Sequence, residues 1–409
     1  MAIQDDFEGA YFWATVPAKL DDPYHDFFYF RENKSIYYHE ALGQWFVFRY
    51  QDVQSLFSAP QLSADRLAGM RQATPEVARP ELDKIASYFN SWVLMSDGEK
   101  HKRIRHFLHQ GFDAKVVQGL RDKIQKSADD LLDQAVSRGG FDVCEDYAFL
   151  LTAYVLADFL GVHPSDREKV VRWSMDFIDY FNVAPITQAN TVKMVASGLE
   201  LINYTRALLN ERRLQPADDF LGTMIKLELG GSGLAEDELV SNAMLLLLAG
   251  HIAVRNFIGN AVWLFFQHPE EFRKLRAAPD LMHQAVEETL RFESPVAAIP
   301  RIPIEDFAFQ GVTFKAGQIV QLVISSANRD PRAFTDPDRF DISRRPSPIV
   351  SFGHGPHACL GAPLAREETR IALESLYRRM PTLALDRARP ITWYRNLGNR
   401  GPVNLPVVF

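Results

Sequence analysis

The stretch Phe-Gly-His-Gly-Pro-His-Ala-Cys-Leu-Gly occupies residues 352–361 and carries the strongest signal in the sequence. Its cysteine, Cys359, has glycines on both sides, and glycine lets a backbone turn sharply and approach a flat ligand closely. A helix is predicted to begin near residue 363, and the N–H groups at a helix start stabilise a thiolate. Thiolates bind soft or borderline metals, so Cys359 is a candidate metal ligand.

The composition excludes several classes of protein. Hydrophobic residues make up 47% of the 409 residues and charged residues 24%, which is typical of a globular chain and not of a disordered one. The net charge of −7 disfavours nucleic-acid binding over the whole surface. Two cysteines, Cys144 and Cys359, are too few for a disulfide framework or a cysteine-rich zinc site. Cys144 is expected to be a small buried hydrophobic residue.

We expect a soluble cytoplasmic protein. The first six residues carry acidic side chains where a signal peptide would be basic. The most apolar stretch, residues 243–266, contains His251, Arg255 and two asparagines, which disfavours a membrane span. This stretch is predicted to form a buried helix in the centre of a large domain.

Helices dominate the predicted structure. Ser96 lies three residues before Glu99, a spacing that predicts a capped helix start. Apolar residues recur at the helical period in several further stretches. The predicted helices span residues 116–136, 149–159, 167–181, 192–209, 237–266 and 363–379.

The predicted β elements are minor. Two aromatic-rich segments, residues 35–38 and 44–48, are separated by a glycine-containing turn and predict a hairpin. A second β-rich patch spans residues 307–322, with turns at Gly311 and Gly317. No linker long enough to separate domains is present, so we predict one mostly α domain over residues 1–409.

The stretch at 352–361 resembles the haem-binding loop of the cytochrome P450 family, Phe-Gly-x-Gly-x-His-x-Cys-x-Gly, and fills every fixed position. The resemblance implies a single-domain cytochrome P450 fold around a buried haem b, an iron protoporphyrin IX. It also implies that Cys359 ligates the iron, which favours O–O cleavage. Phe352, Gly353, His357 and Gly361 are then expected to contact the haem.

Three further matches to the family extend the resemblance over most of the chain. Glu288 and Arg291 fit its Glu-x-x-Arg motif, and Arg339 fits the third member of that buried structural group. The other two matches concern the haem propionates, which cations suit. They imply propionate contacts for His101 and Arg105, which share a helix face, and for Arg301, alongside His357.

The central helix departs from the family pattern Ala/Gly-Gly-x-Asp/Glu-Thr. Ala249, Gly250 and His251 are present, but Ile252 replaces the acid and Ala253 replaces the alcohol that help to deliver protons. Neither side chain forms hydrogen bonds. Four alternatives follow: a substrate hydroxyl relays the proton, peroxide replaces dioxygen, the oxidation inserts no oxygen (as in oxidative coupling), or turnover has been lost.

Three polar residues on this helix have a functional and a structural interpretation. His251 is a candidate proton donor, although a histidine is common here in relatives that keep the acid and the alcohol, which favours a structural role. Arg255 shares its face and either binds a substrate carboxylate or pairs with a nearby acid, and pairing is favoured. Asn256 is interpreted as a residue that bends the helix or holds water.

By resemblance, the substrate pocket is lined by residues 89–95, 175–186 and 296–299 and by a turn near 397–398, and its apolar composition favours a bulky polyketide, macrolide, terpenoid or acyl skeleton. The candidate pocket residues are Phe89, Trp92, Val93, Tyr180, Phe181, Ile252, Ala298, Ile299 and Leu397.

The predicted function is haem-thiolate monooxygenation of a secondary metabolite, either free or linked to a carrier protein. Electrons are expected from a ferredoxin and its reductase, because the chain has no room for a flavin or nicotinamide domain. An acidic ferredoxin fits a basic face formed by Lys100, Lys102, Arg103, Arg105 and Arg366. A haem-binding sensor or carrier-binding module is the alternative outside enzymes.

Overall fold

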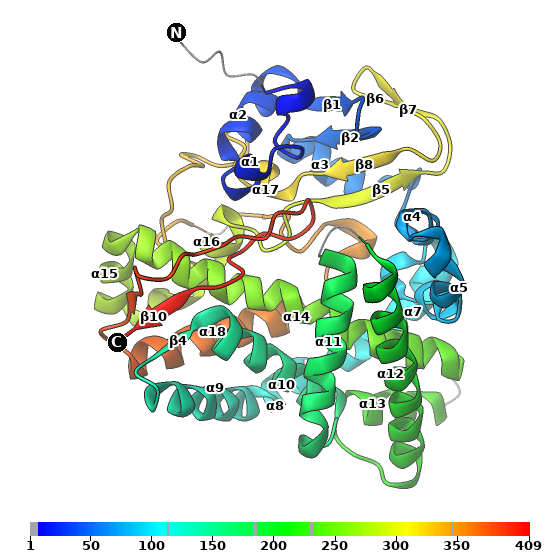
Figure 1. The fold of residues 1–409 in the computed structure, drawn as a ribbon, viewed down its shortest axis with the longest axis vertical. Helices are drawn as coiled ribbons and strands as arrows, with labels where there is room; N and C mark the ends of the chain where they lie inside the picture. Colours follow the sequence, from blue (N-terminus) through cyan, green and yellow to red (C-terminus); the bar gives the residue numbers. More distant parts are fainter. Residues whose placement is uncertain (1–6, 113, 183–185, 230–232, 346) are drawn as a thin grey trace. The chain divides into compact units, whose positions relative to one another are not determined.

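The computed structural model describes residues 7–112, 114–182, 186–229, 233–345 and 347–409. Residues 1–6 and part of the predicted pocket segment 175–186 lie outside this description. The fold is mostly α with a minor β portion, as predicted (Figure 1). The chain forms two compact units. Unit 1 comprises Met1–Ala64, Gly259–Cys359 and Pro390–Leu405, and unit 2 comprises Asp65–Ile258, Leu360–Arg389 and Pro406–Phe409.

Unit 1 is built on a sheet with the strand order β1-β2-β8-β5-β3. The predicted hairpin is confirmed as β1 and β2, which pair antiparallel. β2 then pairs in parallel with β8, and β8 pairs antiparallel with β5 (Figure 1). The strands of this sheet are β1 (Ile36–His39), β2 (Gln44–Val47), β3 (Leu62–Ser63), β5 (Ile299–Pro303) and β8 (Ile319–Leu322).

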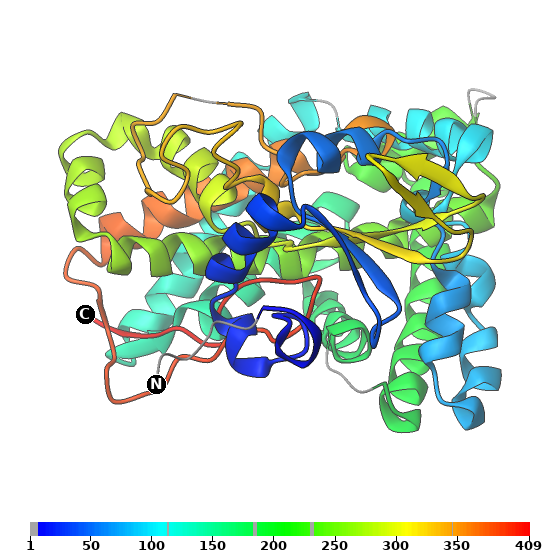
Figure 2. The same cartoon turned by 90° about the horizontal axis from the view of Figure 1, so that it is seen from above.

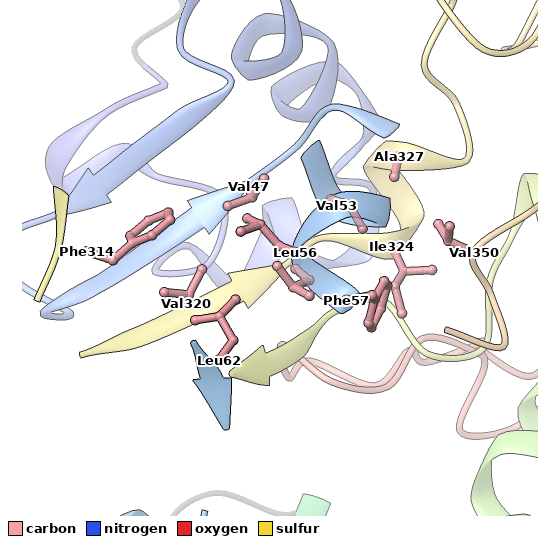
Figure 3. Packing of buried hydrophobic residues seen from close by; sticks show 11 residues of the cluster. Val47, Val53, Leu56, Phe57, Leu62, Phe314, Val320, Ile324, Ala327 and Val350 are labelled. Atoms are coloured by element: carbon pink, nitrogen blue, oxygen red, sulfur yellow. The ribbon is translucent and has the colours of Figure 1, made fainter. Parts of the chain in front are cut away.

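A hydrophobic core joins this sheet to α3 (Tyr50–Phe57) and α17 (Ile324–Ala327). Apolar residues three and four apart give α3 one buried face, and its Leu56 and Phe57 point toward Val320 and Ile324 (Figure 3). A separate hairpin of β6 (Phe307–Phe309) and β7 (Val312–Phe314), yellow in Figure 2, packs its phenylalanines on the same core. Gly311 and Gly317 have φ of +83° and +79°, so the two predicted turns are confirmed.

The remaining helices of unit 1 are short. Aromatic residues of α2 pack on the sheet in a second cluster that includes Phe30, Phe46 and Phe48. The helices are α1 (Pro17–Asp21), α2 (Tyr24–Asn33), α15 (Pro269–Ala277) and α16 (Met282–Phe292).

Unit 2 is helical, with a small sheet of order β4-β10-β9. Its longest helices run side by side in pairs, α11 on α12 and α9 on α18 (Figure 1). The strands are β4 (Gly140–Asp142), β9 (Ala384–Leu385) and β10 (Pro406–Val408). The helices are α4 (Leu67–Ala73), α5 (Arg79–Asp83), α6 (Ala86–Phe89), α7 (Gly98–His109), α8 (Ala114–Gly119), α9 (Arg121–Val136), α10 (Phe149–Leu160), α11 (Arg167–Asn182), α12 (Gln188–Leu214), α13 (Phe220–Leu229) and α18 (Ala362–Arg379).

The long helices lie where the periodicity predicts them, with α12 extending beyond both predicted ends and the 116–136 segment interrupted at residue 120. One cap was assigned wrongly. The hydroxyl of Ser96 donates to the Trp92 carbonyl (2.9 Å) and does not cap α7, which begins at Gly98. A true capping box, formed by Thr187 and Asn190 at the start of α12, was missed.

The central helix α14 (Glu236–Gln267) begins in unit 2 and ends in unit 1. Within the described residues it is the helix that is long and apolar enough to cross a membrane. However, 72% of its most apolar window is buried inside the protein, as expected of a core helix.

Candidate active site

The cysteine loop of unit 1 folds back on itself and presents its sulfur outward. Gly353 and Gly355 have φ of +72° and +70°, a left-handed conformation that other residues adopt at a cost. The N–H of Cys359 donates to the Phe352 carbonyl (2.8 Å), which closes the loop, and the Cys359 side chain is exposed. Gly361 has φ of −80° and is the N-cap of α18 in unit 2.

A buried asparagine fixes the segment that enters this loop. The Oδ1 of Asn328 accepts the N–H of Val350 (3.0 Å), and its Nδ2 donates to the Ser351 hydroxyl (2.7 Å). That hydroxyl donates in turn to the Leu290 carbonyl (2.7 Å) on α16. No short sequence pattern points to Asn328, because its partners lie more than twenty residues away.

Replacing Asn328 with Leu is expected to lower the free energy of unfolding by about 2–4 kcal/mol, because a buried N–H and a buried hydroxyl lose their partner. The Cys359 loop is also expected to shift, so the carbon monoxide complex of the reduced protein will show a smaller thiolate-ligated fraction. Asn328→Asp keeps the acceptor for the N–H of Val350. Its free energy of unfolding and its thiolate-ligated fraction should lie between those of Asn328→Leu and wild type. A Leu variant with wild-type stability and spectrum would show that Asn328 does not position the loop.

The Glu-x-x-Arg pair is buried, as predicted. Arg291 donates to both carboxylate oxygens of Glu288 at 2.8 Å, and both side chains are almost fully buried. Its remaining N–H groups reach the carbonyls of Asn328 (3.1 Å), Pro337 (2.8 Å) and Arg339 (3.1 Å). The pair therefore braces the backbone of Asn328, the residue that holds the cysteine loop.

The third member of this group is Arg344, and the assignment of Arg339 was wrong. Arg344 donates from Nε to Glu288 (3.2 Å) and from its other nitrogens to three carbonyls of the same loop. The Arg339 side chain is 63% exposed and lies 3.8 Å from Asp341. Arg339 contributes its backbone carbonyl, which accepts hydrogen bonds from both Arg291 (3.1 Å) and Arg344 (3.0 Å).

The candidate propionate ligands are divided between the units. In unit 1, Arg301 is buried on β5 with its guanidinium over Phe57, and His357 is half-buried in the turn Gly355–His357. In unit 2, His101 and Arg105 lie one turn apart on α7, with His101 buried and Arg105 half-buried. Both helical residues share one face, as the spacing predicts.

The candidate catalytic stretch lies on α14, with one face open. Ala249 is exposed and Gly250 and Ala253 are half-buried, whereas His251 and Ile252 are buried. Positions 249, 250 and 253 share one helix face. Ala249 and Ala253 leave part of an otherwise buried helix accessible, whereas a Cβ at Gly250 would lie 3.1 Å from the Leu156 side chain of α10.

His251 is packed in the core of unit 2. Its Nε2–H donates to the Phe149 carbonyl (2.9 Å), and its ring packs against the Phe149 ring at a tilt of 30°, with centroids 4.2 Å apart. Burial lowers the pKa of His251 to about 4, so the ring is neutral at neutral pH. This packing favours a structural role for His251 over a role as proton donor.

Arg255 pairs with a nearby acid, which is the favoured one of its two predicted roles. Its Nη2 donates to Glu145 (2.5 Å) and its Nη1 to the Asn256 side chain (3.1 Å). Asn256 is therefore an acceptor for Arg255. The neighbouring Cys144 is fully buried, and burial raises the pKa of its thiol to about 12, so it is the inert residue expected.

An aromatic cluster forms from predicted pocket residues of unit 2. Phe89, Trp92, Phe177 and Phe181 make ring contacts with centroids 4.7–6.4 Å apart, and Phe181 is 41% exposed. The Tyr180 hydroxyl lies 2.8 Å from Thr74 Oγ1.

The backbone beside this cluster is fixed by α14. The buried Asn242 accepts the N–H of Val93 (2.8 Å) and donates to the carbonyl of Ser91 (2.9 Å). Sequence reasoning missed Asn242, which holds a predicted pocket segment in place.

The predicted pocket residues of unit 1 also lie together. The N–H of Ala297 donates to the Gly398 carbonyl (2.8 Å), and Val296 forms a bridge with Asn399. Ala298 is buried, and Ile299 and Leu397 are half-buried on these adjoining segments.

Each unit carries features that fit a planar haem with a thiolate ligand. In unit 1, Cys359 is exposed on a glycine-turned loop. In unit 2, α14 carries small side chains at Ala249, Gly250 and Ala253. In the described part of the chain, no group of three His, Cys, Asp or Glu side chains offers a different metal site.

Comparisons with known proteins agree with this chemistry. The family model "Cytochrome P450" matches residues 166–380. A biotin biosynthesis cytochrome P450 from Bacillus subtilis is 34% identical over 369 residues, covering 89% of this chain and 90% of the relative. The 6-deoxyerythronolide B hydroxylase from Saccharopolyspora erythraea is 32% identical over 406 residues, covering 96% and 98%.

Solved structures share the whole fold. P450BioI in complex with an acyl carrier protein has a TM-score of 0.85 at 33% identity, covering 95% of this chain and 99% of that one. The P450 CxnD, described as forming a C–S bond in chuangxinmycin biosynthesis, has a TM-score of 0.80 at 32% identity, covering 94% of each chain. These matches make the protein a haem b monooxygenase, and the chain belongs to the cytochrome P450 family.

Proposed function

We propose that this P450 hydroxylates or epoxidises a bulky apolar secondary metabolite with dioxygen and two electrons from a ferredoxin and its reductase. The aromatic cluster of Phe89, Trp92, Phe177 and Phe181 carries this proposal, because these predicted pocket residues gather beside α14 and one of them, Phe181, is 41% exposed. Bound haem supplies oxygen activation at its iron. Cys359 would hold the iron, and His101, Arg105, Arg301 and His357 would hold the propionates.

The substrate would supply the proton relay that α14 lacks. Ile252 and Ala253 cannot carry a proton, and His251 is turned to Phe149. Proton delivery then needs water ordered beside Ala249 and Ala253, with a substrate hydroxyl as the relay.

Restoring the missing alcohol tests this relay. The Ala253→Thr variant is expected to change the ratio of product formed to electrons consumed at least twofold, because a hydroxyl then competes with the substrate for water. Product, peroxide release and nicotinamide consumption by the reductase measure this ratio. Ala253→Val has the same shape without the hydroxyl and is the control. Equal ratios in the wild type and both variants would contradict the relay.

A second candidate function is oxidation without oxygen insertion, or oxidation driven by peroxide. The replacement of the acid and the alcohol by Ile252 and Ala253 favours it. A structural relative, CxnD, is described as forming a C–S bond. Product formation with hydrogen peroxide alone, at the rate reached with ferredoxin, would favour this candidate over the first.

The proposals for a carrier protein and a ferredoxin as partners rest on fewer observations. A carrier-linked substrate is supported by the likeness to P450BioI, whose structure contains an acyl carrier protein. The positive charge of the basic face proposed for ferredoxin is lower than the sequence suggests, because Lys102 pairs with Glu99 (2.6 Å) and Arg103 pairs with Glu238 (2.6 Å).

The solved P450s match 94–97% of the chain, which supports the proposal of one domain over residues 1–409.

The substrate class is tested by titrating the haem-loaded protein with macrolides, terpenoids and acyl compounds, both free and carrier-linked, while the haem spin state is followed. A shift from low to high spin followed by an oxidised product would support the proposal. A protein with intact thiolate ligation that gives no product with ferredoxin or with peroxide would contradict it.

A further inference from the structure

Buried arginines in this protein have partners, as the cost of an unpaired buried charge requires. Each donates to a carboxylate, a hydroxyl or a carbonyl at hydrogen-bonding distance. The set comprises Arg31, Arg212, Arg255, Arg291, Arg301, Arg329 and Arg400.

Arg66 is half-buried and differs from these residues, because none of its side-chain nitrogens has a partner among the residues that the structure describes. Its Nε is buried and has no hydrogen-bond partner, and its guanidinium forms no ion pair with the residues that the structure describes. The acid that acts on it is its own neighbour, Asp65, and burial lowers the pKa of the guanidinium. A buried N–H without an acceptor is unfavourable, and a ligand with acceptor oxygens would satisfy it.

The position of Arg66 relates it to the aromatic cluster. Arg66 directly precedes α4 (Leu67–Ala73), and α4 is followed by Thr74, whose hydroxyl contacts Tyr180. At about 1.5 Å of rise per residue, the backbones of Arg66 and Thr74 are roughly 12 Å apart. Tyr180 contacts Phe181 of the cluster at 5.1 Å. An arginine without a partner among the described residues therefore lies one short helix from Tyr180 and from the aromatic cluster, whose Phe181 is 41% exposed.

We propose that Arg66 binds a carboxylate of the substrate, which makes the substrate an amphiphilic acid whose apolar part lies on the aromatic cluster. This inference rests on the proposed function. A guanidinium pairs with a carboxylate through two parallel hydrogen bonds, which an amide or an ester does not reproduce.

Haem propionates offer the same carboxylate chemistry. Cationic candidates for them already exist in His101, Arg105, Arg301 and His357, which favours the substrate as the source at Arg66.

The test compares dodecanoic acid with dodecanamide, which has the same chain and no charge. Dissociation constants are measured by calorimetry on the haem-loaded wild type and on Arg66→Gln. The wild type should prefer the acid, and Arg66→Gln should weaken acid binding 10- to 100-fold while changing amide binding less than threefold. Arg66→Lys should retain part of the preference.

The matched control is Arg71→Gln on the same helix. Arg71 is about half exposed and is paired with Asp83 (2.9 Å), so its loss should leave the affinity for the acid unchanged. A wild type that binds acid and amide equally, or binds neither, would overturn the inference. So would equal acid affinity in the wild type and Arg66→Gln.

Haem content and the rate of haem transfer to apomyoglobin identify the source of the carboxylate. If Arg66→Gln loses haem at least tenfold faster and keeps the wild-type preference for the acid, the partner is a propionate and the inference fails. Product analysis tests the proposed function separately from the binding site. Binding of the acid that depends on Arg66, without any oxidised product, would contradict the proposed function and support the binding site.

Discussion

The Arg291→Leu variant is expected to lose about 3–5 kcal/mol of unfolding free energy, because Glu288 stays buried without its main counter-charge. Three carbonyls, including that of Asn328, lose their donor at the same time. Arg344→Leu should cost less, about 1–3 kcal/mol, because Arg291 still pairs with Glu288. Urea denaturation of haem-loaded protein at matched haem content measures both changes.

Arg339→Leu is the matched control for this group. The Arg339 side chain is largely exposed, and its role is carried by a backbone carbonyl that the substitution keeps. Its stability is expected to lie within about 0.5 kcal/mol of wild type. If Arg339→Leu destabilised the protein as much as Arg344→Leu, the assignment of Arg344 as the third member would be wrong.

The local parts of the fold were predictable because their signals are local. Helices α10, α11 and α14 repeat apolar residues at the helical period, and the hairpin of β1 and β2 is contiguous in sequence. The parallel pairing of β2 with β8 was not predictable, because it joins Val47 to Leu322 across most of the chain. Register over such a distance depends on tertiary packing, which periodicity does not encode.

The candidate site also has parts with a local sequence signal and parts that depend on distant residues. The Cys359 loop is a continuous pattern of fixed positions, whereas Arg344 reaches Glu288 from 56 residues away. Sequence spacing alone placed that role on Arg339, because a motif does not show which side chain a turn directs inward. Arg66 and Asn328 were missed for a related reason. Burial without a partner, and hydrogen bonds to distant backbone, are visible only in the folded chain.

Glu368 on α18 is a buried acid that the proposed function does not use. It is 2% exposed, and its Oε1 has no hydrogen-bond partner in the described part of the chain. Desolvation disfavours the charged form and raises the pKa of Glu368 to about 8. The carboxyl is therefore protonated in the folded protein at neutral pH and ionised in the unfolded chain, where its pKa is near 4.5.

This difference makes stability fall as pH rises. Below about pH 4.5 both states hold the proton, and between pH 4.5 and 8 only the folded state does, so unfolding releases a proton. Each unit of pKa difference is worth about 1.4 kcal/mol, so wild type should lose on the order of 3–5 kcal/mol over this range relative to Glu368→Gln. The glutamine keeps the shape of the protonated acid and does not titrate.

Urea denaturation of wild type and Glu368→Gln at several pH values between 5 and 8 measures the effect. The two stabilities should be similar near pH 5, and the glutamine variant should become steadily more stable in comparison as the pH rises. Glu374→Gln is the control on the same helix, because Glu374 is 37% exposed and paired with Arg370. The difference in unfolding free energy between Glu374→Gln and wild type should stay nearly constant with pH. Parallel curves for wild type and Glu368→Gln would mean that Glu368 is ionised in the folded protein, and burial would then have to be offset by a cation.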